Sequence, residues 1–281
     1  MSREKNVNRK RAAWSAAILL LAGMCLSVSV YAAQRFWAHR EERFVPSYAE
    51  LTLTEKTDYE TIFRQTGLGQ TAADKLLQED GIAGLQRAQE LFFHPPEEAC
   101  RSLFGWFTRE DRLVSNGVQL VDLQPGDILL TLSTHSAGWR HGHAGLVIDK
   151  DTVLECGLLG TDSSLKSAES WSCYTNYAVL RVKGITQQQQ ERMKQYALST
   201  LYKVPYRLLA GFSGVKAPKS DEPGFGLQCA YLVWYAWNHF GYDLDADGGR
   251  LVTANDLLDA DHVEVVQIYG MNPEDFLEEE K

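Results

Sequence analysis

The stretch His141–Cys156, HGHAGLVIDKDTVLEC, decides which fold this sequence predicts. It contains two apolar runs, HAGLVI and TVLEC, separated only by Asp149-Lys150-Asp151. Short apolar runs joined by a tight polar turn are typical of an antiparallel hairpin. The first run begins at the second of two histidines, and the second run ends with a glutamate and a cysteine. These side chains fit a metal site, part of a catalytic centre or an ordinary hairpin, and the rest of the chain has to distinguish them.

The length of the hairpin turn determines which side chains share a face. A three-residue turn at 149–151 places His143 opposite Gly157, with Glu155 one diagonal step away on the same face. A carboxylate at that distance can reach an imidazole nitrogen. A two-residue turn shifts the register by one residue, so that Cys156 shares the face of His143 instead. The sequence leaves both registers open.

Further strands and helices accompany this hairpin. Strand-like apolar runs, ILLTL, YAVLRV and VEVVQI, begin at Ile128, Tyr177 and Val263. A helical pattern, TQQQQERMKQYALSTLY, begins at Thr186. Strands and helices segregate along the chain rather than alternating, which predicts an α+β fold with a small antiparallel β-sheet packed on helices.

The N-terminus carries a segment typical of export or membrane attachment. Five basic residues among the first eleven precede an uncharged apolar run from Ala12 to Val30. Residues 1–33 therefore fit a signal peptide, with Val30 and Ala32 at the two positions that a signal peptidase reads, or a membrane anchor of about 20 residues. Both interpretations stay open. Because basic residues precede the apolar run, we expect the rest of the protein to be extracytoplasmic, secreted or anchored to the cell membrane by this segment.

Charge and cysteine content exclude several classes of protein. Removal of residues 1–32 leaves 23 basic and 36 acidic residues, a net charge of −13, so we expect no nucleic-acid partner. The four cysteines that remain permit two disulfides in three pairings, but their density is too low for a disulfide scaffold. They are Cys100, Cys156, Cys173 and Cys229. We expect at least one to be kept as a free thiol for chemistry.

The chain divides into four parts. After residues 1–33, residues 34–116 are predicted to be a helical accessory region, with apolar residues at three- and four-residue spacing and a break at Asp80-Gly81. Within it, PPEEACRSLFGWF is predicted to open a further helix, because proline and acidic residues favour a helix start. Residues 117–270 are predicted to form the α+β domain that contains the His141–Cys156 hairpin, and residues 271–281 an acidic tail.

The segment GLQCAYLVWYAWNHFGYDLD predicts a helix that begins at Cys229 and is capped by Gly241. Free backbone N–H groups and the helix dipole stabilise a thiolate in the first turn of a helix. Cysteine hydrolases combine such a thiolate with an imidazole and a polar group that orients it, and His143 and Glu155 fit those two roles. The competing interpretation is that Cys229 is a buried core residue.

Six motifs in order resemble a known family. They are PGDILLT, HGHAGLVID, VLEC, AVLRV, YALSTLYKVPY and QCAYLVWYAWNHFGYDLDADGG. Together they resemble the circularly permuted branch of the NlpC-type papain-like cysteine peptidase superfamily, the YycO/YiiX-like proteins related to lecithin retinol acyltransferase. The resemblance covers Leu120 to Ile268, a little over half of the chain, and its specificity lies in the order and spacing of short motifs.

The resemblance implies a role for each matching residue. Cys229 corresponds to the nucleophile, His143 to the general base and then acid, and Glu155 to the group that orients the imidazole. Tyr206 occupies a position where many relatives keep a tyrosine near the cleft, which implies substrate contact. The relatives commonly read Cys-Ser-Glu-Leu-Val where this chain reads Cys-Ala-Tyr-Leu-Val, a departure that puts substrate contacts rather than the nucleophile in doubt.

Metal sites are the competing interpretation of two motifs. A set of His135, His141, His143 and Glu155 lacks any accompanying Cys-x-x-Cys or His-Glu-x-x-His motif, and His141 is expected to be a solvated or supporting group. The segment DLDADGG at 243–249 matches the opening of a calcium loop, but its twelfth position is Ala254 rather than a carboxylate. It is predicted to be an acidic turn. We expect no metal and no cofactor.

Trp171, Trp234 and Trp237 are predicted to be core residues rather than a platform for sugar rings. The expected function is an extracytoplasmic cysteine hydrolase that cleaves an amide bond, first in cell-wall peptide. Two alternatives stay open: a lipid acyl hydrolase or acyltransferase at the membrane, and a catalytically silent wall-binding module. The expected partners are cell-wall peptide or acyl-lipid, with membrane contact through the N-terminal segment if it is uncleaved.

Overall fold

Two antiparallel sheets form the framework of the fold. The computed structural model describes residues 14–27, 43–105, 107–136, 139–212, 214–222 and 224–277. The larger sheet has the strand order β10-β9-β3-β6-β7-β8 and the smaller β1-β2-β4-β5, with every pairing antiparallel. The strands are β1 (Glu98–Phe104), β2 (Thr108–Leu113), β3 (Ile128–Thr131), β4 (Thr134–Ser136), β5 (Trp139–Arg140), β6 (His143–Asp149), β7 (Thr152–Glu155), β8 (Ser164–Ser167), β9 (Tyr177–Val182) and β10 (Val263–Tyr269). The predicted α+β class with an antiparallel sheet is confirmed.

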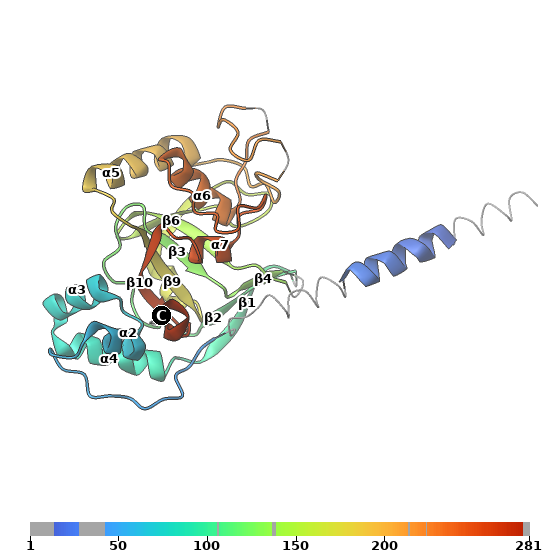
Figure 1. Ribbon diagram of the computed structural model, residues 1–281. Coiled ribbons are helices and arrows are strands. Elements are labelled where there is room, and N and C mark those ends of the chain that lie inside the picture. The colour runs from blue at the N-terminus through green and yellow to red at the C-terminus, as the bar shows by residue number, and fades with distance from the viewer. Residues whose placement is uncertain are drawn as a thin grey trace, which may run out of the picture.

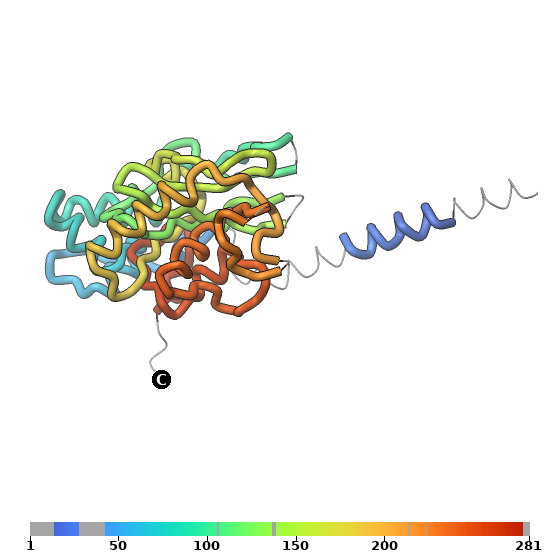
Figure 2. Tube along the Cα trace, turned by 90° about the horizontal axis from the view of Figure 1, so that it is seen from above, coloured from blue at the N-terminus to red at the C-terminus, as the bar shows by residue number. Residues whose placement is uncertain are grey.

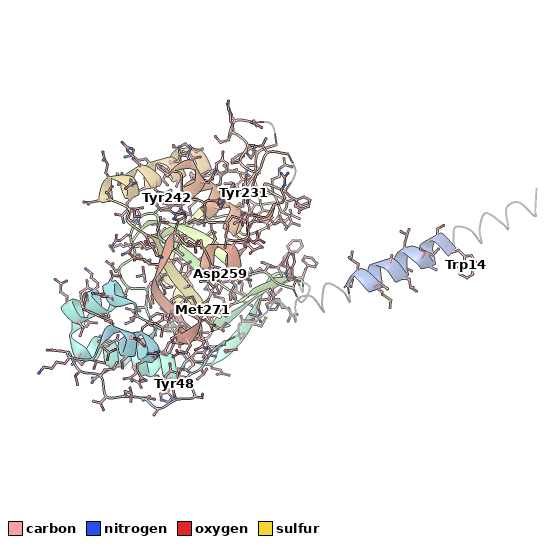
Figure 3. All side chains as sticks on the ribbon, viewed as in Figure 1. Trp14, Tyr48, Tyr231, Tyr242, Asp259 and Met271 are labelled. Atoms are coloured by element: carbon pink, nitrogen blue, oxygen red, sulfur yellow. The ribbon has the colours of Figure 1, made fainter. Side chains whose placement is uncertain are left out.

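Helices cover both faces of the larger sheet. One face packs against α2 (Tyr59–Thr66), α3 (Gln70–Asp80) and α4 (Ile82–Phe93), and the other against α5 (Gln187–Tyr196), α6 (Cys229–His239) and α7 (Ala254–Leu258) (Figure 1). Short helical turns lie at Ala168–Cys173, Ala197–Leu201 and Pro273–Phe276. Figure 3 shows Tyr231 and Tyr242 on the α5–α6 side of the sheet and Tyr48 on the α2–α4 side.

Alternation along the strands builds a separate core on each face. In β3, Ile128 and Leu130 belong to the core beneath α5–α7, and Leu129 belongs to the core beneath α2–α4. In β9, Leu180 belongs to the core beneath α5–α7 and Val179 to the core beneath α2–α4. Successive side chains of a strand point to opposite faces. Because helices cover both faces of the sheet, the sequences of the central strands are continuous apolar runs.

One helix prediction is wrong. The segment from Pro95 contains β1, which pairs with β2 in a hairpin whose turn includes Gly105 at φ 55°. Figures 1 and 2 both show this hairpin extending from one side of the molecule (Figure 1, Figure 2). Prolines and acidic residues favour a helix start, but the backbone hydrogen bonds here come from another strand, which local composition does not report. The described part of residues 34–116 therefore contains three helices and a β-hairpin.

The two ends of the chain are described in part. Residues 14–27 form a helix, and no helix of the described ranges combines the length and apolar character needed to cross a membrane. The basic residues before it and the Val30 and Ala32 motif lie outside the described residues. In the predicted acidic tail, Glu274 accepts a hydrogen bond from Arg64 Nε at 2.7 Å, and residues 278–281 lie outside the described part.

Candidate active site

A bulge in the β6–β7 hairpin sets the register. The turn itself has two residues, 150–151, but the pairing shifts by one next to Asp149. A bulge of this kind adds one residue to one strand. It restores the register expected from a three-residue turn, so that Gly145 lies opposite Glu155 and Glu155 shares a face with His143.

Glu155 and Trp171 hold the imidazole of His143. The Nε2 atom of His143 lies 3.2 Å from Glu155 Oε2, and the indole Nε1 of Trp171 donates to Glu155 Oε1 at 2.7 Å. The Trp171 ring also stacks on the imidazole, with centroids 5.4 Å apart and planes 12° from parallel. Trp171 is fully buried, as predicted for a core residue. Its contact with the carboxylate was missed, and the only sequence signal for it is that a buried indole N–H needs an acceptor.

Cys229 occupies the first turn of α6, as predicted. The N-cap residue Gln228 accepts hydrogen bonds on Oε1 from the Ala230 N–H at 3.0 Å and from the Cys229 thiol at 3.2 Å. Burial by itself raises the pKa of Cys229. The hydrogen bond and charge of His143, with the backbone N–H groups of Ala230 and Ala144, outweigh burial and lower the pKa of the thiol below its ordinary value.

Cys229, His143 and Glu155 each shift the pKa of a neighbour within the set. Burial favours neutral His143, but its hydrogen bonds to Cys229 and Glu155, and their negative charges, raise its pKa to about 10. Burial opposes the charge of Glu155 as well, yet the bond and charge of His143 lower the pKa of this carboxyl. Because Nε2 of His143 faces Glu155, Nδ1 is the nitrogen left for Cys229. The arrangement favours a thiolate beside an imidazolium, with a carboxylate behind it.

Gly142 allows the chain to enter β6 at His143. It has φ 70°, a left-handed conformation that favours glycine. A Cβ built there would lie 2.7 Å from the Thr131 carbonyl oxygen and 2.8 Å from Ala254 Cβ. A larger residue would separate β3 and α7 from the strand that carries the histidine.

Tyr206 and Cys156 lie beside this centre. Burial and the charge of Cys229 raise the pKa of Tyr206, which is half-buried and donates its backbone N–H to the Thr161 carbonyl at 2.9 Å. Cys156 is fully buried in the core beneath α5–α7, on the face of β7 opposite to Glu155, and its thiol donates to the Leu227 carbonyl at 3.3 Å. Burial raises the pKa of Cys156 to about 12, so it stays a neutral thiol at pH 7.

The remaining candidate residues have other partners. His141 lies 3.0 Å from the Ser136 hydroxyl, and burial lowers its pKa. Trp234 and Trp237 are buried, as predicted, and each donates its indole N–H. The cysteines of the described residues, Cys25, Cys100, Cys156, Cys173 and Cys229, are free thiols.

Two clusters of the described residues have the side chains to hold a metal ion. They are Cys100 with Asp111 and His135, and Asp245 with Asp247 and Asp256. Neither cluster gathers the predicted alternative set of His135, His141, His143 and Glu155. In the first cluster the Arg140 guanidinium donates to Asp111 at 3.2 Å, and this positive charge competes with a cation.

Comparison with known proteins gives one structural similarity. The structure is similar to the crystal structure of the metalloprotein yiiX from Escherichia coli O157:H7, with a TM-score of 0.39 and 19% sequence identity. The match covers 51% of this chain and 96% of that chain. No family profile and no curated protein matches the sequence.

Proposed function

We propose that this protein is an extracytoplasmic cysteine hydrolase that forms a covalent acyl-enzyme on Cys229. The chain of contacts from Cys229 through His143 to Glu155 carries the proposal. It joins a thiol of lowered pKa, an imidazole of raised pKa and an orienting carboxylate, the three groups that such enzymes need. The order of histidine strand, carboxylate strand and cysteine helix supports a permuted papain-like, NlpC-type domain at residues 117–270.

The proposed reaction has two steps. In the first, the Cys229 thiolate attacks the carbonyl carbon, and the carbonyl oxygen takes the negative charge. The N–H of Cys229 has no acceptor within its own helix, because it lies in the first turn, and can donate to this oxygen. The tetrahedral intermediate then collapses to a thioester, and the His143 imidazolium gives its proton to the departing amine or alkoxide.

In the second step a water molecule hydrolyses the thioester. Neutral His143 takes a proton from the water as its oxygen bonds to the carbonyl carbon. The S–C bond breaks, the product leaves as a carboxylic acid that then loses its proton to solvent, and the Cys229 thiolate beside the His143 imidazolium is restored. Glu155 keeps the imidazole oriented through both steps.

Cell-wall peptide is the first proposed substrate. An export or anchor segment would place the catalytic domain outside the cytoplasm, where peptide amides of the wall are available. The resemblance of the Leu120–Ile268 segment to NlpC-type hydrolases supports the same substrate.

Acyl-lipid is the second candidate substrate, and exposed apolar side chains on two loops favour it. The loop that follows Tyr206 is tied to the entrance of α6, because the Arg207 N–H donates to the Leu227 carbonyl at 2.8 Å. A second loop meets it where the Tyr206 N–H donates to Thr161. The tips of these loops carry apolar side chains that are each more than half exposed: Leu159, Leu208, Leu209 and Val215. Exposed apolar side chains on loops that are joined to the entrance of the cysteine helix suit an acyl chain.

A cysteine-directed activity probe tests the proposed centre. The wild type should be labelled at Cys229, with the labelled peptide located by mass spectrometry, and Cys229→Ala should not be. His143→Ala should be labelled much more slowly, whereas Cys100→Ser removes an exposed thiol outside the centre and should change only background labelling. Equal labelling of wild type and His143→Ala would contradict the assignment and favour the silent wall-binding module.

Product analysis separates the two substrates. The protein is incubated with purified peptidoglycan and, separately, with acyl-lipid vesicles, each against Cys229→Ala as the blank. New amino groups in the first mixture support the peptide amidase, and free fatty acid in the second supports the lipid hydrolase.

A further inference from the structure

An acidic cluster lies between α6 and α7, apart from the Cys229 centre. Asp245, Asp247 and Asp256 each place one carboxylate oxygen within 4.8 Å of the others. The first two belong to the loop after α6, and Asp256 belongs to the first turn of α7. Three carboxylates at this spacing repel one another unless positive charge lies between them. The hydrogen bonds of each carboxylate show which oxygens still need a partner.

Asp245 has a buried oxygen without a partner. Its side chain has no exposure to solvent, and Oδ2 accepts from the Lys216 ammonium. The other oxygen, Oδ1, is buried and has no hydrogen-bond partner among the described residues. A buried carboxylate oxygen without a hydrogen bond is costly, and a coordinated cation removes that cost. Lys216 neutralises only one of the three carboxylates.

The other two carboxylates are held in place by one oxygen each. Asp256 Oδ2 accepts from the backbone N–H and the hydroxyl of Thr253, both at 2.7 Å. Asp247 Oδ1 accepts from the Gly249 N–H at 2.6 Å. These bonds leave the second oxygen of each carboxylate available to a ligand. The two oxygens are Oδ1 of Asp256 and Oδ2 of Asp247.

The fold supplies the ligand that the sequence motif lacks. Asp245 and Asp247 stand at the third and fifth positions of the loop that opens at Asp243, and the loop fails as an EF-hand because Ala254 stands at the twelfth position. Asp256, two residues further on, brings a carboxylate to the cluster from α7. Asp243 has a different role, because its Oδ1 accepts from the Trp234 indole at 2.7 Å and from the Asp245 N–H at 3.1 Å.

We propose that Asp245, Asp247 and Asp256 bind a calcium ion. All the side-chain ligands are hard carboxylate oxygens, which suit calcium rather than zinc. Calcium accepts irregular carboxylate sets, whereas magnesium demands near-octahedral geometry and keeps most of its water. Lys216 retains Oδ2 of Asp245, and the ion takes Oδ1.

The bound ion also orders the entrance of α6. The loop between the two halves of the cluster carries Val252, whose carbonyl accepts from Gln228 Nε2 at 2.6 Å. Gln228 in turn caps the Ala230 N–H. An ion that links Asp245 to Asp256 restrains this loop, and through it the cap of the helix that begins with Cys229.

Calorimetric titration of the whole protein with calcium chloride tests the site without any need for catalysis. Saturable binding is expected with a Kd on the order of 10⁻⁴ to 10⁻³ M, the range of extracellular calcium modules, and magnesium chloride should not saturate at the same concentrations. Asp247→Asn should weaken calcium binding at least tenfold. Asp261→Asn makes the same charge change at an exposed acid outside the cluster and should bind as the wild type does.

Both variants alter exposed side chains, so both should fold, with far-ultraviolet circular dichroism as the check. No saturable binding, equal binding of magnesium, or equal weakening in the two variants would each overturn the calcium site. Amide hydrogen exchange at residues 228–231 should slow with calcium in the wild type and not in Asp247→Asn. Unchanged exchange in the wild type would overturn the restraint on α6 while leaving the binding result to stand on its own.

Discussion

Glu155 lies directly opposite Gly145, and the absence of a side chain at Gly145 leaves the space through which the carboxylate reaches His143. A Cβ at Gly145 would lie 2.5 Å from Val153 Cγ1, 3.1 Å from Glu155 Cγ and 3.3 Å from Trp171 Cζ2. The imidazole is therefore oriented by a residue whose position depends on a glycine of the neighbouring strand.

Gly145→Ala should displace Glu155 and Trp171 together. Overpacking of this kind costs about 1–3 kcal/mol of stability, and we expect the rate of Cys229 alkylation at pH 7 to fall with it. The matched control is Gly157→Ala, whose Cβ would lie 3.4 Å from His143 Cε1, an ordinary contact distance. Iodoacetamide kinetics and urea denaturation of both variants make the comparison. A fully reactive, fully stable Gly145→Ala would show that the glycine is not required.

Trp171→Phe should slow Cys229 alkylation while the fold remains intact. Phenylalanine keeps a ring against His143 but removes the indole N–H that donates to Glu155 at 2.7 Å, and a hydrogen bond to a charged group contributes about 1.5–3 kcal/mol. Trp237→Phe removes a comparable buried indole bond, to the Gly126 carbonyl at 3.1 Å, far from the imidazole. It should lose stability without a change in alkylation rate. Equal rates of Cys229 alkylation in Trp171→Phe and Trp237→Phe would contradict the positioning role of Trp171.

The Cys229–His143 pair should make stability depend less on pH between pH 6.5 and pH 9 than either group would by itself. Taken singly, the raised pKa of His143 contributes stability that is complete below pH 6.5 and is lost as the pH rises toward 10. The lowered pKa of Cys229 contributes stability that is complete above pH 9 and is lost as the pH falls. The two trends have opposite signs in this window, so each offsets part of the other.

Cys229→Ala removes the thiol whose titration opposes that of His143, and it leaves the hydrogen bond and charge of Glu155 to raise the pKa of the imidazole. Its free energy of unfolding, measured by urea denaturation relative to the wild type, should fall with rising pH just above pH 6.5, by up to about 1.4 kcal/mol per pH unit. Each protein is compared at the same series of pH values, so other titrating groups affect both alike. Parallel pH profiles for the two proteins would contradict the thiolate–imidazolium pair.

Asp127→Asn should destabilise the larger sheet strongly. The Asp127 carboxylate has no solvent exposure and accepts from Nε and Nη2 of Arg181, each at 2.8 Å. Loss of its charge leaves a buried guanidinium without its main partner, at a cost of about 3–5 kcal/mol. Asp151→Asn breaks a pair with Lys150 in which both side chains are exposed to solvent, and it should change stability little. Urea denaturation measures both, and a similar small loss in each would show that the buried pair is dispensable.

Patterns among neighbouring residues predicted most of the strands and helices that carry the proposed catalytic side chains. The strand that begins at His143, the strand that carries Glu155 and the helix that begins at Cys229 were all expected, because apolar runs and helix-start signals act over a few neighbouring residues. The same kind of signal failed at Pro95, where a helix start was expected and β1 was found. There the deciding hydrogen bonds come from β2, and composition cannot report a partner elsewhere in the chain.

The sequence by itself determined which residue types are available and on which elements they lie: a cysteine at a helix start, a histidine at a strand start, and a glutamate and an acidic loop further along. Tertiary structure alone decided how they meet. A two-residue turn by itself would have placed Glu155 on the wrong face, and the bulge beside Asp149 returns it to His143. Likewise, Asp256 joins Asp245 only because α7 packs back beside the loop. Both outcomes depend on how different segments pack against one another, and the energy of that packing comes from residues throughout the fold. No local pattern of residues therefore encodes either outcome.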